Sequence, residues 1–396
     1  MPKFFLSVVC IMIIFSQDIF AQIVNIPDPN FKAALLNQST PVIDTNGDDE
    51  IQVSEALATT VISAVSNNIS DITGIEAFVN LESLNCFNNP INEVDLSQNT
   101  SLNVITFTFS NLTEIDLSSN NDLFSVSLSN SPINEINVSN LTNLEVLNLN
   151  STNVSSIDVS NNLNLLFLDL FFTNVQSLDV TNNDPLEYLS ISGTQISDFD
   201  FSILPNLKIL GMRNTDFENV DLSSNSQLCN ISIRNCPQLT SINIQNGNNP
   251  ALAQNQPCVL NFTFGGTSIT SGLFANTGNS SLEFICVDDI IFAEDNFLLV
   301  LPQVEFLEDC SSLSTDTFAS SVVTIYPNPV VDVLEISSPQ LIEDVEIFSV
   351  TGARVYKAKS DGRKMNLDVE ALSPGIYFLS LKSDTTENQT IKFVKK

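Results

Sequence analysis

The sequence predicts a mainly β protein in which short repeats stack into a solenoid, and three observations support this. Leucine returns every 21 residues over more than a third of the 396-residue chain. Apolar residues recur three and five positions after each leucine, which is the alternation of a half-buried strand. Each period is too short for a helix beside its strand. A fixed period of this kind indicates identical units that bury their apolar edges against one another. The recurring leucines are Leu81, Leu102, Leu123, Leu144, Leu165, Leu186, Leu207 and Leu228.

Positions within a repeat are counted from the recurring leucine, which is offset 0. We expect offsets 0, 3 and 5 to point inward, for example Leu144, Leu147 and Leu149 in one repeat. Stacking sets the strands of neighbouring coils ~4.8 Å apart in a parallel sheet. Offset 10 adds another inward column, and offsets 13 and 15 predict a second short strand in each coil. The pattern predicts about nine coils over residues 60–246.

Two polar columns interrupt the apolar pattern. Short polar side chains at these positions can hydrogen-bond backbone groups that are freed where the coil turns, so we interpret both columns as structural. Offset 8 carries Asn89, Ser110, Ser131, Thr152, Thr173, Thr194, Thr215 and Cys236. Offset 18 carries Asn99, Asn120, Asn162, Asn183 and Asn225, and is broken by Leu141 and Leu204.

Segments of different character flank the repeats. Residues 22–59 predict a small helical N-terminal cap that covers the first coil. Residues 247–310 predict an irregular last coil, with one more strand at Leu282, Ile285 and Val287, and a C-terminal cap. The Ser/Thr-rich residues 311–321 are predicted to be a linker. Residues 322–396 have balanced charge and five short strand-like runs, which favour an antiparallel β-sandwich.

The N-terminus predicts export. Residues 1–21 combine Lys3, an apolar run and a small residue, Ala21, and are typical of a signal peptide. The apolar run is too short to span a bilayer, so we expect no membrane-spanning segment. In an oxidising space, we expect Cys286 to pair with Cys310 and Cys258 to pair with either Cys229 or Cys236. Cys86 falls at offset 5 and is expected to be buried.

Composition narrows the functional classes. The formal net charge is −32, and such a surface repels nucleic acid and anionic lipid. The chain contains no histidine, which removes the commonest general base and the usual zinc ligand. We therefore expect a protein that is not an enzyme. A hydrolase that uses only carboxylates is a less favoured alternative.

Two parts of the chain resemble known families. The repeat L-x-x-[LIV]-x-[LIVFMC] over residues 60–246 resembles the leucine-rich repeat family, and this resemblance implies a binding surface. Residues 322–396 resemble the C-terminal sorting domain of type IX secretion cargo. That resemblance implies the type IX machinery as a partner, and release from or attachment to the outer surface of a Gram-negative bacterium. Its matching residues are Tyr326-Pro327-Asn328-Pro329, Asp332, Leu334, Ile336, Gly352, Leu372, Pro374-Gly375-Ile376-Tyr377-Phe378 and Lys392-Phe393-Val394-Lys395-Lys396.

The segment from Asp44 to Glu55 resembles an EF-hand calcium loop. Oxygen ligands in such a loop converge on one calcium ion, which would rigidify the cap as a structural cofactor. Asp49 occupies the place of the usual turn glycine, so the alternative is an acidic turn that only caps the solenoid. The predicted ligands are Asp44, Asn46, Asp48, the carbonyl of Glu50, Gln52 and Glu55.

An acidic column at offset 14 has two interpretations. It could collect cations or supply paired carboxylates for hydrolysis, but a solvated face that keeps the stacked coils soluble is favoured. The column consists of Asp95, Asp116, Asn137, Asp158, Asp179, Asp200 and Asp221.

The outward face of the predicted sheet is the candidate ligand site. Exposed aromatic residues beside arginines have the composition of binding hot spots. The alternative is that some of these phenylalanines pack beneath their neighbours. The candidates, at offsets 2, 6 and 7, are Phe87, Phe109, Phe167, Phe171, Phe172, Tyr188, Ile209, Arg213 and Arg234. We therefore predict a secreted or cell-surface protein that binds a protein or glycan ligand. The alternative is a calcium-stabilised structural or adhesive surface component.

Overall fold

The computed structural model divides the chain into two compact units, Met1–Asp309 and Cys310–Lys396, and each unit is described by itself. The structure describes residues 22–253, 258, 260, 272–274, 278–297, 304–310, 324–326, 330–349, 353–383 and 389–396. The predicted signal peptide at 1–21 and the predicted linker at 311–321 lie outside the described residues. None of the described helices is long and apolar enough to cross a bilayer.

Two short helices form the N-terminal cap, α2 (Pro29–Leu36) and α3 (Val53–Ala58). Asp28 caps α2, because its carboxylate accepts hydrogen bonds from the Asn30 and Phe31 N–H groups at 2.8 and 3.1 Å. The same carboxylate accepts the Ser70 N–H at 2.9 Å, which ties the cap to the first coil.

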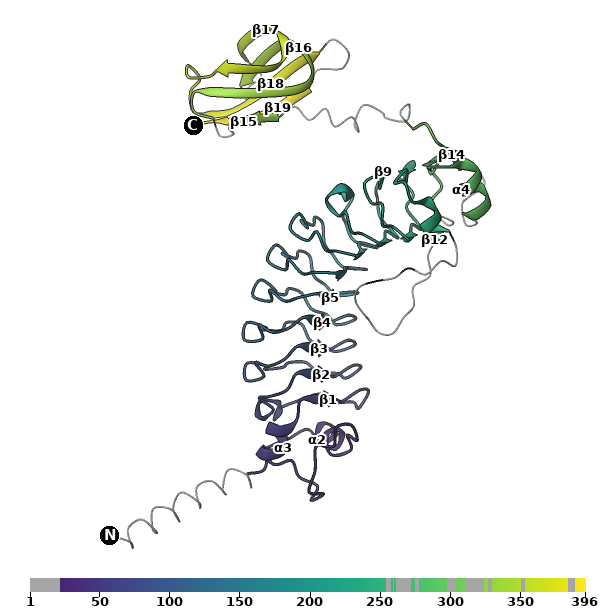
Figure 1. The fold of residues 1–396 in the computed structure, drawn as a ribbon. Coiled ribbons are helices and arrows are strands. Elements are labelled where there is room, and N and C mark those ends of the chain that lie inside the picture. Colours follow the sequence, from purple (N-terminus) through teal and green to yellow (C-terminus); the bar gives the residue numbers. More distant parts are fainter. Residues whose placement is uncertain are drawn as a thin grey trace, which may run out of the picture. The chain divides into compact units, whose positions relative to one another are not determined.

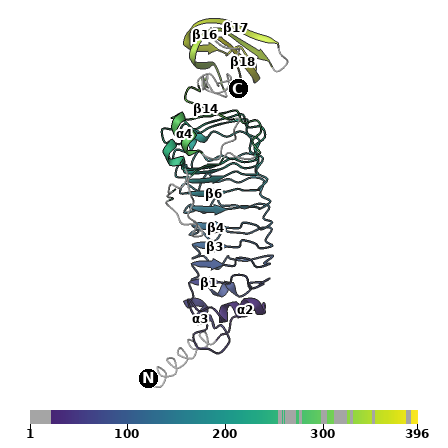
Figure 2. The same ribbon diagram turned by 90° about the vertical axis from the view of Figure 1, so that its right-hand side faces the viewer.

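A parallel sheet of ten strands runs along the solenoid (Figures 1 and 2). The strands fall at offsets 2 to 4 of the repeats, and the pairing places each residue beside the residue at the same offset in the next coil. Side chains of one offset therefore form a column one strand spacing apart. The strands are β1 (Val61–Ser63), β2 (Ser83–Asn85), β3 (Val104–Thr106), β4 (Ser125–Ser127), β5 (Val146–Asn148), β6 (Phe167–Asp169), β7 (Tyr188–Ser190), β8 (Ile209–Gly211), β10 (Asn230–Ser232) and β12 (Gly272–Phe274).

The predicted inward columns form one continuous core. Leu144, Leu147 and Leu149 are fully buried, and so are their equivalents in the neighbouring coils. The described coils also contain three short 3-10 helices, η1 (Ile75–Ala77), η2 (Phe201–Ile203) and η3 (Asn249–Leu252). The solenoid prediction is confirmed, and its core consists of the columns that the alternation assigned to the interior.

A second parallel sheet forms only near the end of the solenoid. It contains β9 (Asn219–Asp221), β11 (Ser241–Asn243), β13 (Phe284–Cys286) and β14 (Glu305–Leu307). The prediction of a second strand in every coil is thus wrong for the earlier coils that the structure describes. β13 pairs with β11, so Leu282, Ile285 and Val287 continue the second column rather than the first. The two columns share the same apolar spacing, and the pattern alone therefore does not separate them.

Asparagines at offset 18 join consecutive coils on the inside of a turn. Asn162 Nδ2 donates to the carbonyl oxygens of Val138 and Leu141, at 3.0 and 2.7 Å. Asn99, Asn120, Asn183 and Asn225 make the same pair of bonds. Where Leu141 interrupts the column, the adjacent Asn140 donates to Leu117 O at 2.9 Å instead. The predicted structural role of this column is confirmed.

The polar side chains at offset 8 also form hydrogen bonds with the backbone. Thr152 and Thr194 donate their hydroxyls to carbonyls three residues earlier, both at 2.7 Å. Cys236 continues the column with a free, buried thiol that donates to Met212 O.

The other cysteines differ in state. Cys258 is disulfide-bonded to Cys229, which decides between the two partners, Cys229 and Cys236, that the sequence left open. Burial raises the pKa of the free Cys86 thiol to about 12.

The C-terminal cap covers the last coil with α4 (Ile290–Asn296) and β14. Phe297 stands between them, with its ring centroid 6.1 Å from those of both Phe292 and Phe306. Cys286 and Cys310 are both disulfide-bonded.

The second unit is antiparallel, as predicted. It contains β15 (Thr324–Tyr326), β16 (Val333–Ser349), β17 (Arg354–Asp368), β18 (Gly375–Ser383) and β19 (Gln389–Lys395). Register shifts between Ser337 and Asp344 interrupt the long β16–β17 pair, and such irregularities bend strands. The sheet encloses a core that includes Leu334, Val345 and Phe393.

We predict that Asn162→Ala lowers the free energy of unfolding by about 1–3 kcal/mol, because two buried carbonyls lose their donor. The matched control is Asn161→Ala, which removes the exposed side-chain amide of the preceding residue. This variant should change the free energy of unfolding by less than about 0.5 kcal/mol. Urea unfolding of both variants measures the difference. Equal losses would show that the column does not hold the coils together.

Candidate ligand-binding face of the solenoid

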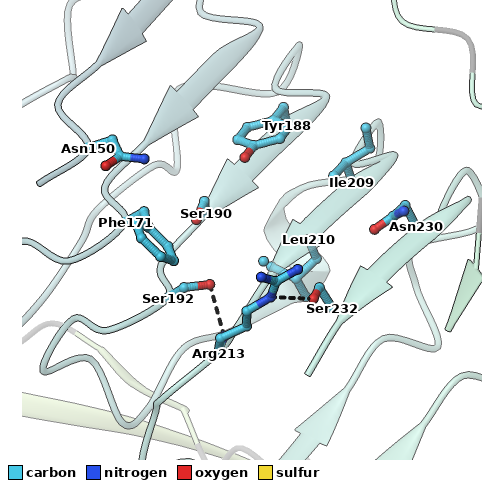
Figure 3. A pocket seen from close by; sticks show the side chains of 11 residues that line it. Asn150, Phe171, Tyr188, Ser190, Ser192, Ile209, Leu210, Arg213, Asn230 and Ser232 are labelled. Carbon is cyan, nitrogen blue, oxygen red and sulfur yellow. Dashed lines mark hydrogen bonds between the residues drawn. The ribbon is translucent and has the colours of Figure 1, made fainter. Parts of the chain in front are cut away.

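A hollow of about 340 Å³ lies on the outward face of the ten-stranded sheet, over β7, β8 and β10 (Figure 3). This volume is in the range of small-ligand sites. The lining residues come from offsets 2, 4 and 6 of neighbouring coils, with one neighbour from the strand interior. They are Asn150, Phe171, Tyr188, Ser190, Ser192, Ile209, Leu210, Gly211, Arg213, Asn230 and Ser232.

Small residues create this hollow. At offset 4, consecutive coils carry Ser190, Gly211 and Ser232, and at offset 6 Ser192 stands between Phe171 and Arg213. A Cβ atom on Gly211 would lie 3.0 Å from Ser190 Oγ and 3.2 Å from Ser192 Oγ. The absence of a side chain at this position therefore leaves the floor of the hollow open.

Arg213 forms one wall of the hollow (Figure 3). Its Nε donates to Ser232 Oγ at 2.7 Å, and its backbone N–H donates to Ser192 Oγ at 2.9 Å. In the described part of the chain, Arg213 makes no salt bridge with a carboxylate. The bond to Ser232 orients the guanidinium but leaves its terminal N–H groups available.

A buried carboxyl group lies beside this face. Asp169 accepts the Phe171 N–H at 2.9 Å and the Asn150 amide at 3.4 Å. Burial raises the pKa of Asp169. Burial, and then the charge of Asp169, also raises the pKa of Tyr188, so its phenol stays neutral. Asp169 does not line the hollow and acts as part of the scaffold, whereas the neutral Tyr188 side chain is part of the lining.

Two of the predicted ligand residues are not open to solvent. Phe167 and Ile209 are each only 4% exposed, so the prediction that they form a water-exposed surface is wrong. The cause is the in-register stacking of offset 2, where Phe167 lies beside Val146 and Tyr188. The rings of Phe167 and Tyr188 stack with centroids 4.2 Å apart and an interplanar angle of 14°. Ile209 is the next member of the same column.

The other predicted residues are accessible to differing degrees. Phe109 and Phe172 are 49% and 51% exposed, and Arg213 is exposed. Phe87, Phe171, Tyr188 and Arg234 are half-buried. The structure brings Phe171, Tyr188, Ile209 and Arg213 together in the hollow and leaves Arg234 outside its lining.

Phe109 and Phe172 share an unusual backbone conformation. Offset 7 has positive φ in every coil from Asn88 to Asn235, with φ of 57° at Phe109 and 51° at Phe172. Asparagine, serine or glycine occupies this position in the other coils, and phenylalanine there is strained. Phe109 and Phe172 also make edge-to-face pairs with Phe87 and Phe171, at 5.6 and 4.4 Å. Strain that is kept at an exposed aromatic side chain favours a functional role.

A second hollow of about 320 Å³ adjoins Phe109. It is polar apart from this ring and Pro90, and lies nearer the N-terminal cap. Its lining residues are Ser66, Asn68, Asn88, Asn89, Pro90, Phe109 and Asn111.

Several residues of the main hollow were not among the sequence candidates. Offset 4 contains none of the sequence candidates, although inward offsets 3 and 5 require offset 4 to face outward with offsets 2 and 6. Ser190, Gly211 and Ser232 belong to this column. Asn150 and Asn230 lie at offsets 6 and 2, like several predicted residues. Asparagine is common throughout the repeats, so neither residue stands out in the sequence.

The side chains of the acidic column at offset 14 accept backbone hydrogen bonds in the turns. Each Asp, and equally Asn137, accepts the backbone N–H of the residue two positions later, for example Ser160 for Asp158 at 2.9 Å. These serine or threonine residues lower the pKa of Asp95, Asp116, Asp158 and Asp179 by hydrogen bonding. Because asparagine serves as well at one position, the turn requires an acceptor oxygen rather than a charge. Neither hollow described above is lined by Asp or Glu.

The backbone of the predicted calcium loop has the expected turn. Asp49 adopts φ of 63°, the left-handed conformation that glycine usually supplies at that place. Asp44 accepts the N–H groups of Gly47 and Asp49 at 2.7 and 3.2 Å, and Asp48 accepts that of Glu50 at 3.0 Å. Backbone N–H groups of the loop therefore orient the carboxylates of Asp44 and Asp48, and the Asp48 N–H orients Asn46 by donating to its Oδ1 at 2.9 Å.

Glu55 departs from the expected ligand arrangement. Its carboxylate accepts the Thr45 N–H at 2.7 Å and the Gln52 N–H at 3.1 Å, and so caps α3. Within the described ranges, no three His, Cys, Asp or Glu side chains are grouped closely enough to hold a metal. Oxygen atoms of Asp44, Asn46, Asp48 and Gln52 are of the type that calcium prefers. Gln52 donates to both carboxylate oxygens of Asp48 at 3.0 and 2.9 Å and accepts from Asn46 at 3.0 Å, so these side chains, like Glu55, would have to exchange hydrogen bonds for the ion. Calcium binding stays a prediction.

Comparison with known proteins identifies the C-terminal unit. Residues 324–396 match the family described as the secretion system C-terminal sorting domain. This segment indicates secretion or display at the cell surface, and interaction with the type IX secretion machinery. A search of curated proteins gave no match to the chain.

Among solved structures, the chain is similar to internalins of Listeria monocytogenes. Internalin F is 17% identical, with 72% of this chain and 96% of that chain covered and a TM-score of 0.44. Internalin C2 is 20% identical, with 48% and 98% covered and a TM-score of 0.38. PorZ, a surface component of the type IX system of Porphyromonas gingivalis, is 20% identical over 20% of this chain and 12% of that chain, with a TM-score of 0.18. These likenesses concern the fold and carry no functional argument. The chain combines a leucine-rich repeat solenoid with a type IX sorting domain.

We predict that Phe167→Ala destabilises the protein by about 3–5 kcal/mol, because the side chain is buried. In contrast, Phe172→Asn places the residue typical of offset 7 at a strained, exposed position, so stability should be unchanged or higher. Urea unfolding compares the two variants. A loss for Phe172→Asn as large as that for Phe167→Ala would show that Phe172 belongs to the core.

Proposed function

We propose that this secreted protein binds a protein or glycan ligand outside the cell through the outward face of its parallel sheet. The observation that supports this most is the hollow between Phe171 and Arg213, in which a rigid sheet presents aromatic, hydroxyl, amide and cationic groups together. A rigid scaffold with a few polar groups at a concave site is the usual design of a binding site. The sorting domain delivers the sheet to the place where the ligand is found.

Probing glycan and protein arrays with the full chain tests this proposal. Phe171→Ser should abolish capture of the ligand, because it removes the aromatic wall of the hollow. The matched control, Phe124→Ser, changes an exposed phenylalanine that does not line the hollow and should leave capture intact. Equal capture by both variants would place the ligand elsewhere.

Removal of residues 324–396 should abolish appearance of the protein in the culture supernatant and on the cell surface. The truncated protein should accumulate inside the cell envelope, since the sorting domain is the part that the secretion machinery recognises. Fractionation and immunoblotting of cells that express the two forms measure this. Normal release of the truncated form would contradict the assignment of the tail.

We propose a second, structural role for the N-terminal cap as a calcium-stabilised element. The left-handed Asp49, which completes the turn of an oxygen-rich loop, supports it. Calcium at a hundredfold excess over its dissociation constant would add about 2.7 kcal/mol to the free energy of unfolding. The melting temperature should therefore rise relative to chelator, and Asp48→Asn should remove the rise. Asp49→Asn is the control, because it changes charge without removing a predicted ligand. No rise in the unmodified chain would exclude this role.

A further inference from the structure

We propose that the hollow between Phe171 and Arg213 binds a carboxylate-bearing sugar, that is, a uronate unit of an acidic glycan. This inference rests on the proposed function of the sheet face as a ligand site, and it adds the chemical class of the ligand. The charge distribution, the width of the gap and the polarity of the lining each support it.

The charge distribution singles out Arg213. Residues 22–309 contain only four Lys or Arg, namely Lys32, Lys208, Arg213 and Arg234. Lys32 pairs with Glu50 at 2.6 Å, and Lys208 pairs with the buried Glu187 at 2.9 Å. Arg213 is exposed and forms no ion pair in the described part of the chain. In so acidic a unit, a positioned guanidinium with terminal N–H groups available is suited to a carboxylate, which it can bind through two hydrogen bonds.

The gap beside Arg213 has the width of one ring. Phe171, Ser192 and Arg213 occupy offset 6 of three successive coils, so Phe171 and Arg213 stand two strand spacings, roughly 9.6 Å, apart. At offset 2 of the same coils, Tyr188 fills the position next to Phe167 and stacks on it at 4.2 Å. Ser192 leaves the equivalent position at offset 6 unfilled. A ligand ring can therefore lie against Phe171 and direct its carboxylate to Arg213.

The lining favours a hydroxylated ring over an acidic peptide. Around the gap stand the hydroxyls of Ser190, Ser192 and Ser232 and the amides of Asn150 and Asn230 (Figure 3). Ser192 and Ser232 each accept one hydrogen bond from Arg213, and their hydroxyl hydrogens can be donated to the oxygens of a polyhydroxylated ligand. A peptide carboxylate would engage Arg213 alone, whereas a sugar acid would engage Arg213 and these two hydroxyls together.

Isothermal titration calorimetry of the full chain with oligogalacturonate tests the inference. The comparison ligand is the methyl ester of the same oligosaccharide, which keeps the ring and removes the charge. We expect binding of the acid, and affinity for the ester reduced roughly tenfold or more. A polyglutamate peptide should not bind at this site.

Three variants assign the binding to the hollow. Arg213→Gln should weaken oligogalacturonate binding roughly tenfold or more and abolish the preference for acid over ester. Arg234→Gln changes net charge equally, lies outside the lining, and should alter affinity by less than about twofold. Gly211→Val fills the floor beside Ser190 and Ser192 without removing a polar group and should also abolish binding. Thermal melts of each variant check that the fold is retained.

Equal affinity for acid and ester, equal effects of Arg213→Gln and Arg234→Gln, or tighter binding of polyglutamate would each overturn the inference. Capture of another ligand that is lost in Phe171→Ser, together with no oligogalacturonate binding, would refute the sugar-acid assignment alone. The proposed function would then stand. Absence of any ligand that depends on Phe171 would refute both.

Discussion

The structure depends on the register between consecutive coils. Backbone hydrogen bonds pair each strand with the same offsets of the next coil, and asparagine side chains at offset 18 donate to carbonyls of the preceding turn. With this register fixed, each offset becomes a column with one environment. Apolar offsets form the interior, and polar offsets either satisfy the turns or face the solvent. A shift of one residue would exchange the two faces of every strand.

The candidate site lies where the columns change in composition. Offset 2 becomes aromatic at Phe167 and Tyr188, offset 4 becomes small at Ser190 and Gly211, and offset 6 changes from phenylalanine to arginine across Ser192. Because every column keeps its spacing, a change from large to small to large produces a hollow of defined width. The site therefore requires no loop insertion, and its walls share the rigidity of the sheet. This supports a binding surface that is preorganised for its ligand.

Much of the fold could be predicted from the sequence because the physical cause repeats. The inward columns, the turn asparagines and the caps follow from period, alternation and capping residues, and the structure confirms them. The burial of Phe167 and Ile209 could not be predicted from alternation, because it depends on what the neighbours at offset 2 carry. The two apolar columns share one spacing, so the pattern at Leu282, Ile285 and Val287 predicts a strand but not the sheet that it joins. The partner of Cys258 depends on the path of the chain after the last regular repeat, and spacing does not encode this path.

The site was predicted only in part for a related reason. Large or charged residues such as Phe171, Tyr188 and Arg213 attract attention in a sequence, whereas a hollow is made by the small residues between them. Gly211 and Ser192 are informative only once the register is known. Likewise, the acidic column suggested an electrostatic role, but Asn137 shows that its hydrogen-bonding geometry is the common property.

Amide hydrogen exchange of the full chain, resolved to individual residues, tests the stacked register most directly. The account predicts protection that recurs every 21 residues, highest at the strand amides that donate to the neighbouring coil, such as Phe167 and Tyr188. Uniformly fast exchange across residues 81–232, or protection without the 21-residue period, would contradict it.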